Sequence, residues 1–158
     1  MEFNNIKELQ KYLNSQINQV MQNEMANMVK DEEQRTIDKT VYDSYKPGTS
    51  DGEPWVYKRR RDDGGLRSRE NMKVNINQSV EGVELTVENV TKGAQGYRID
   101  EVIESGKGYE YTSNRDGTAN QYTSPRPFTK NTEESIAAKD LHTKTMRKAL
   151  KDKGLDII

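Results

Sequence analysis

Residues 4–42, NNIKELQKYLNSQINQVMQNEMANMVKDEEQRTIDKTVY, contain the strongest pattern in this 158-residue chain. Apolar side chains recur in this stretch mainly at three- and four-residue steps, the spacing of one stripe on an α-helix. No proline or glycine interrupts the stretch, and Pro47-Gly48 ends any continuation. A helix of this length would reach roughly 55 Å, longer than a domain of this size needs. The stripe consists of Ile6, Leu9, Leu13, Ile17, Val20, Met21, Met28, Ile37 and Val41.

This helical stripe has two interpretations. It packs against the core of its own domain, or it forms a packing face for a neighbouring subunit. The flexible side chains of Met21, Met25 and Met28 suit either arrangement. The run from Lys30 to Arg35 is nearly all polar, so a break or fray at this point is also compatible with the pattern.

Two later segments alternate between apolar and polar residues. Met72, Val74 and Ile76 alternate with polar side chains, and the segment 83–88 repeats the pattern. Such alternation is typical of strands with one buried face, so we expect an antiparallel hairpin with one wet face. The pattern of apolar residues at 99–106 predicts a short helical turn or strand that ends at Gly106.

The last predicted element is one amphipathic helix of about 22 residues that follows Pro127-Phe128. Asn131 or Thr132 is its expected N-cap, and Gly154 is its expected stop. The sequence therefore predicts an α+β fold with a long N-terminal helix, a small antiparallel β-sheet, a C-terminal amphipathic helix and long loops. We expect residues 1–42 to form the N-terminal helix and 43–158 the α+β domain, as one structural unit.

Composition limits the size of the core. Apolar residues make up 31% of the chain and charged residues 32%, whereas globular domains usually contain about 45–50% apolar residues, with glycine counted. We therefore expect a thin domain with long solvated elements, completed by neighbours in an assembly.

Several classes of function find no support in the sequence. The chain has no cysteine and one histidine, His142, which excludes disulfides and any site with two imidazoles. No acidic pair stands out as catalytic, so we expect no enzyme activity, no metal and no cofactor. No apolar run approaches the roughly 20 residues of a membrane span, and no secretory signal is expected. The expected location is the cytoplasm, or a particle assembled there.

A basic cluster lies within the irregular segment 43–65, beside two aromatic residues and just before Asp62-Asp63. Solvated or acid-paired charge is one interpretation of it, and contact with nucleic acid or with an acidic partner is the other. The candidate interface residues are Trp55, Tyr57, Lys58, Arg59, Arg60 and Arg61.

Three short motifs occur in a fixed order: Gly64-Gly65-Leu66-Arg67 before the first strand, Tyr-x-Ile-x-x-x-Ile-Glu-x-Gly at 97–106, and Pro125-Arg126-Pro127-Phe128 before the last helix. In this order and spacing, residues 60–150 resemble the tail-completion, or neck, proteins of long-tailed phages. The motif residues, which we expect mainly to maintain the fold, are Gly65, Leu66, Glu104, Gly106, Arg126, Pro127 and Phe128.

The resemblance implies an α+β domain in a homo-oligomeric ring, with DNA passing through its centre; a hexamer is one candidate size. The implied partners are copies of the chain, head connector or adaptor proteins, tail terminator or tail tube proteins and, transiently, packaged DNA. The implied location is the neck of a virion assembled in the host cytoplasm. The alternative hypothesis is a nucleic-acid-binding phage accessory protein that uses the basic cluster 58–61, and it predicts salt-dependent DNA affinity.

Overall fold

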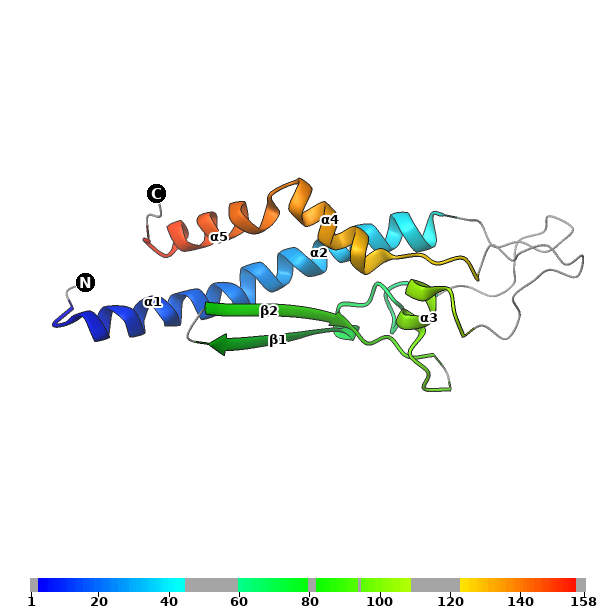
Figure 1. Cartoon of the computed structure of the whole chain (residues 1–158), viewed down its shortest axis with the longest axis horizontal. Coiled ribbons are helices and arrows are strands. Elements are labelled where there is room, and N and C mark those ends of the chain that lie inside the picture. Colours follow the sequence, from blue (N-terminus) through cyan, green and yellow to red (C-terminus); the bar gives the residue numbers. More distant parts are fainter. Residues whose placement is uncertain (1–2, 45–59, 80–81, 94, 109–122, 156–158) are drawn as a thin grey trace, which may run out of the picture.

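The computed structural model describes residues 3–44, 60–79, 82–93, 95–108 and 123–155 (Figure 1). Its spine is one uninterrupted helical rod made of α1 (Ile6–Val20), η1 (Met21–Met25), α2 (Ala26–Ile37) and η2 (Asp38–Tyr42). The two η segments are single π-helical turns, and the backbone stays right-handed helical through every junction. The predicted N-terminal helix is therefore confirmed.

The polar run in the middle of the spine does not fray. Glu32 and Glu33 are only 2% and 5% exposed, so this part of the rod buries carboxylates where an ordinary stripe would bury apolar side chains. Both make hydrogen bonds to other elements, which allows the helix to continue through a polar segment.

The predicted hairpin is also confirmed. Strands β1 (Met72–Ser79) and β2 (Gly82–Asn89) pair antiparallel, with Val74 opposite Val87 and Ile76 opposite Leu85. The apolar residues of both strands face the spine and their polar neighbours face solvent, as the alternation predicted. The 99–106 segment is the helix α3 (Ile99–Ser105), ended by Gly106 in the left-handed conformation.

The C-terminal helix differs from the prediction. It is divided into α4 (Phe128–Ala138) and α5 (Leu141–Asp152), with Asp140 at φ 52° between them. Asp is one of the few residues that adopt this left-handed conformation readily, and the turn lets each helix pack on the spine at its own angle. The predicted N-caps were also wrong, because Asn131 and Thr132 lie inside α4, which begins at Phe128.

Two apolar clusters hold these elements together. The first joins the end of the spine to β1 and α4, and Phe128, Leu66 and Met72 are each 2% exposed or less within it. The second joins the middle of the spine to α5 and the hairpin through Val20, Met25 and Leu150. The spine thus forms the shared wall of both clusters, while the hairpin and the C-terminal helices lie on different sides of it (Figure 1).

Several of the family-motif residues make contacts between elements of the fold. Leu66 and Phe128 lie in the first cluster, and Gly106 closes α3 where a Cβ would come within 2.5 Å of the Thr123 carbonyl oxygen. Pro127 directly precedes α4, and the Arg126 backbone N–H donates to the Ile103 carbonyl at 3.0 Å. These contacts attach α3 to the start of α4.

Gly65 provides a test of this structural role. A Cβ at Gly65 would lie 2.3 Å from the Arg60 carbonyl oxygen and 2.7 Å from that of Arg61, so the substitution Gly65→Ala must displace backbone. We expect Gly65→Ala to lower the free energy of unfolding by about 3 kcal/mol, because the atoms it meets are backbone, and Gly64→Ala by only about 1 kcal/mol. Urea denaturation measures this change. Gly64→Ala is the comparison, because it meets no close atom and is opposed only by its φ of 66°. Equal losses for the two variants would contradict the steric argument.

Candidate functional site: an acidic groove

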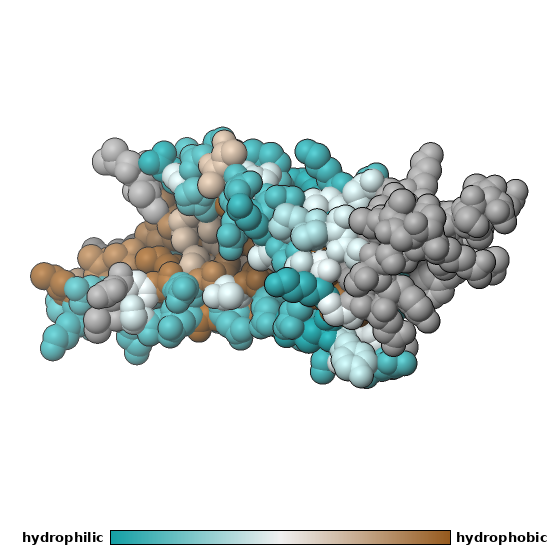
Figure 2. Space-filling model, turned by 45° about the vertical axis from the view of Figure 1, so that its right-hand side comes forward, coloured by the Kyte–Doolittle hydropathy of each residue, from teal (hydrophilic) through white to brown (hydrophobic). Residues whose placement is uncertain are grey.

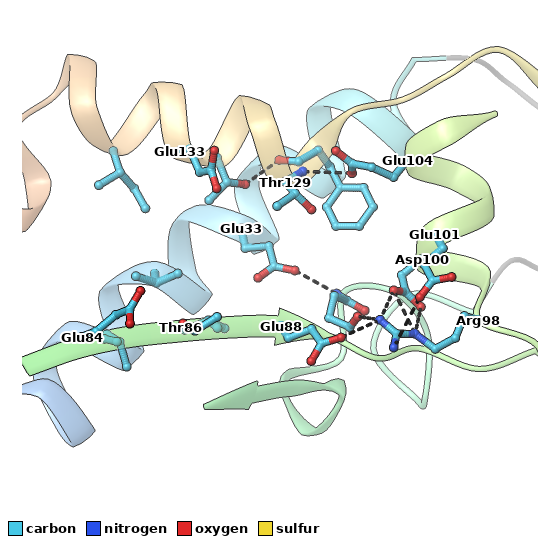
Figure 3. Close-up of a pocket in the computed structure, with 17 residues that line it drawn as sticks. Glu33, Glu84, Thr86, Glu88, Arg98, Asp100, Glu101, Glu104, Thr129 and Glu133 are labelled. Atoms are coloured by element: carbon cyan, nitrogen blue, oxygen red, sulfur yellow. Dashed lines mark hydrogen bonds and ion pairs between the residues drawn. The ribbon is translucent and has the colours of Figure 1, made fainter. Parts of the chain in front are cut away.

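An open groove of about 670 Å³ lies between β2 and α4, with α2 at its base (Figure 3). Residues 84–89 of β2 line it without a gap, so the groove follows one edge of this strand. Leu85, Val87 and Ile136 contribute apolar surface to it. One cation, Arg98, faces seven acidic side chains, which are Glu33, Glu84, Glu88, Asp100, Glu101, Glu104 and Glu133.

Glu33 extends from α2 into the base of the groove (Figure 3). Its Oε1 accepts a hydrogen bond of 2.9 Å from the side-chain amide of Asn89. Burial raises the pKa of Glu33 to about 7; the hydrogen bond from Asn89 opposes the rise, whereas the charges of Glu104 and Asp100 add to it. This carboxyl group is therefore partly protonated near neutral pH.

Asn89 is the hydrogen-bonding centre of this region. Its side-chain nitrogen donates to Glu33 and, at 2.8 Å, to the carbonyl of Leu66. Its side-chain oxygen accepts from the hydroxyl of Thr91 at 2.6 Å. Asn89 is 7% exposed, so water cannot replace these partners without opening the fold. One amide side chain thus links the spine, the end of β2 and the Gly65-Leu66 turn.

Glu32, the neighbour of Glu33 on α2, faces the C-terminal part of α4. It accepts hydrogen bonds from Ser135 of α4, from Lys139 directly after this helix, and from Arg35 at 3.0 Å. Burial alone would raise the pKa of Glu32, but the hydrogen bonds from Lys139, Ser135 and Arg35 outweigh it and lower the pKa to about 2. The pKa values of these two adjacent glutamates are therefore shifted in opposite directions. Glu32 favours its charged form and Glu33 its neutral form.

Arg98 closes one end of the groove. Its guanidinium forms a two-pronged contact with Asp100 at 2.6 and 2.9 Å, and it donates to the Glu88 carboxylate at 3.1 Å. It also donates to the Asn89 carbonyl at 2.8 Å, which fastens the start of α3 to the end of β2. Glu104 accepts a hydrogen bond from the Thr129 backbone N–H at 3.1 Å. An acidic side chain from α3 thereby caps the first turn of α4.

The predicted basic cluster is only partly within the described residues. Trp55, Tyr57, Lys58 and Arg59 lie outside them. Arg61 forms ion pairs with Asp38 at 3.0 Å and Asp43 at 3.5 Å, and its guanidinium lies over the Tyr42 ring. Arg60 is exposed and donates to the Lys92 carbonyl at 3.2 Å. At Arg61 these contacts match the acid-paired interpretation of the cluster.

Glu32, Glu33 and Asn89 were not predicted from the sequence as functional or structural key residues. The spacing contained a signal for one of them. Val29, Glu33, Ile37 and Val41 follow one another at four-residue steps, so Glu33 occupies a position of the apolar stripe. A carboxylate in that position indicates a buried polar contact. No comparable pattern identifies Asn89, whose role depends on where β2 ends relative to α2.

Metal binding and membrane insertion find no support in the described part of the chain. No group of three or more His, Cys, Asp or Glu side chains is arranged there to hold a metal ion. None of the helices in the same residues is both long enough and apolar enough to cross a bilayer. The groove is lined mainly by acidic and apolar side chains.

Fold and groove together define a small α+β protein with an acidic groove. Residues 5–152 match the model of the YomN family, so the chain belongs to this family. The family is phage-derived and takes its name from YomN of a Bacillus prophage. Neither the curated proteins nor the solved structures include a match to the chain.

Proposed function

We propose that the chain is a non-enzymatic structural subunit of a phage neck, where it forms a homo-oligomeric ring that joins the head connector to the tail tube and lets DNA pass. The phage-derived family supports the phage assignment. The order of a long helix, a hairpin and C-terminal helices supports the tail-completion resemblance.

One observation supports assembly most directly. Within the described residues, the apolar stripe of the spine continues past the last element that packs on it. Ile6 is 74% exposed and Leu9 is 37% exposed, whereas Val20 on the same stripe is fully buried. In Figure 2 the apolar surface gathers at the end of the molecule where α1 lies. A helix that exposes such a face usually packs against a partner.

The oligomeric state of the purified chain tests this proposal. We expect a discrete oligomer in sedimentation velocity and rings in electron micrographs. The double substitution Ile6→Glu and Leu9→Glu should dissociate it, because two charges would be buried without partners at the contact. Both side chains are exposed in the single chain, so the variant should still fold.

The matched control adds two glutamates to the same helix at exposed positions away from the stripe, Asn14→Glu and Ser15→Glu. This control should assemble like the unmodified chain. A wild-type chain that stays monomeric at high concentration, even with its neck partners present, would contradict the proposal. Equal assembly of both double variants would exclude the α1 stripe as the contact.

A further inference from the structure

The groove is incompletely neutralised within the described residues. The single guanidinium of Arg98 is shared among Asp100, Glu88 and Glu101. Glu84 on β2 and Glu133 on α4 line opposite walls of the groove, and neither side chain makes an ion pair or a hydrogen bond inside the described ranges (Figure 3). A groove with seven acidic side chains and one basic side chain favours a cationic occupant and repels phosphate.

A complementary surface lies on α5. Lys144, Lys148 and Lys151 are exposed, follow one another at four- and three-residue steps, and form no ion pair with any described residue. They lie on the side of α5 opposite Ala149 and Leu150, which pack on the spine. Lys148 and Lys151 therefore point away from their own chain, whereas the Lys144 ammonium also donates a hydrogen bond of 2.6 Å to the Lys139 carbonyl.

The dimensions of the two surfaces agree. From Lys144 to Lys151 a helix rises roughly 10 Å. From Glu84 to Glu88 an extended strand covers roughly 14 Å. The aliphatic parts of lysine side chains can also cover apolar surface such as that of Leu85, Val87 and Ile136 while the ammonium groups reach the acidic walls.

We propose that the groove of one copy binds the lysine row of α5 of a second copy, so that copies join head to tail. This inference rests on the proposed function, because it requires the chain to assemble with itself. A contact between two different surfaces of the same chain repeats from copy to copy, and it closes into a ring when the rotation allows. The apolar stripe of α1 would supply a separate contact.

Charge reversal tests the pairing of these two surfaces. The groove variant contains Glu84→Lys and Glu133→Lys, and the helix variant contains Lys148→Glu and Lys151→Glu; all four side chains are exposed. Each variant alone should associate at least about tenfold more weakly than the wild-type chain in sedimentation velocity at low salt, since like charges would meet. An equimolar mixture of the two should recover assembly, because each acidic surface then meets a basic one.

Lys7→Glu with Lys11→Glu is the control, because it changes the net charge as the helix variant does, at exposed positions on α1. It should assemble like the wild-type chain, and circular dichroism should show all variants folded. A wild-type oligomer that both charge-reversal variants also form would overturn the groove contact and leave the proposed function standing. Separate dissociation without recovery on mixing would also overturn the pairing. A monomeric wild-type chain would overturn both proposals.

Discussion

The substitution Glu33→Gln should raise the free energy of unfolding at pH 8 by about 2–3 kcal/mol and leave it nearly unchanged at pH 4. The pKa of Glu33 is raised from 4.5 to about 7 in the folded chain, mainly by burial. One pKa unit corresponds to about 1.4 kcal/mol. Glutamine has the same shape as the protonated side chain and can still accept the hydrogen bond from Asn89.

The direction of this effect follows from proton binding. Between pH 4.5 and about 7 the folded chain retains the Glu33 proton that the unfolded chain has lost. Stability contributed by this residue is therefore complete below pH 4.5 and is lost as the pH rises through 7. Lys30 partly opposes the shift, whereas Glu104 and Asp100 reinforce it. Urea denaturation at a series of pH values measures the change.

Glu32→Gln is the matched control, since the same substitution one residue earlier should act with the opposite sign. The pKa of Glu32 is lowered to about 2, so its contribution is present above pH 4.5 and is lost as the pH falls towards 2. We expect Glu32→Gln to destabilise the chain at pH 8. A Glu33→Gln variant that is no more stable than the wild-type chain at pH 8 would show that Glu33 is ionised without penalty.

The substitution Asn89→Asp should lower the free energy of unfolding at pH 8 by about 3–5 kcal/mol. The shape of the side chain is retained, but the two donated hydrogen bonds, to Glu33 and to the Leu66 carbonyl, are lost. In their place a second carboxylate faces Glu33 in a buried position, where like charges destabilise strongly. Thermal and urea denaturation both measure this loss.

Asn75→Asp is the control for Asn89→Asp, because Asn75 is an exposed residue of the same hairpin. It should change stability by less than about 0.5 kcal/mol. In the double variant Glu33→Gln with Asn89→Asp, the amide introduced at position 33 can donate a hydrogen bond to the carboxylate introduced at position 89. One donor–acceptor pair is therefore restored with its direction reversed. It should be at least about 1 kcal/mol more stable than the sum of the single effects predicts. Additive effects would mean that the two side chains do not interact.

Much of the secondary structure could be predicted because it depends on local periodicity. The alternation at 72–77 and 83–88 placed both strands, and the stripe at 6–41 placed the long helix. The division of the C-terminal helix at Asp140 could not be predicted in this way, because the apolar pattern continues across it. The break depends on how α4 and α5 each meet the spine, which is a long-range property.

The acidic groove was not predicted from the sequence. Its walls are β2 and α4, which are separated by almost forty residues, so no local pattern shows that Glu84 and Glu133 line one cavity. Glu104 was identified through the family motif, but its contact with Thr129 became visible only in the fold. Glu33 could have been noticed from its position in the stripe, whereas its raised pKa depends on Asn89, Asp100 and Glu104.

By itself the sequence determined the element types, the wet and buried faces of the hairpin and the unusual length of the helix, because side-chain periodicity and turn residues act over a few positions. Only the tertiary structure decided which charges are buried, which are paired and which remain open to a partner. Those properties depend on distances between elements remote in sequence, and burial then sets the electrostatic strength of each contact.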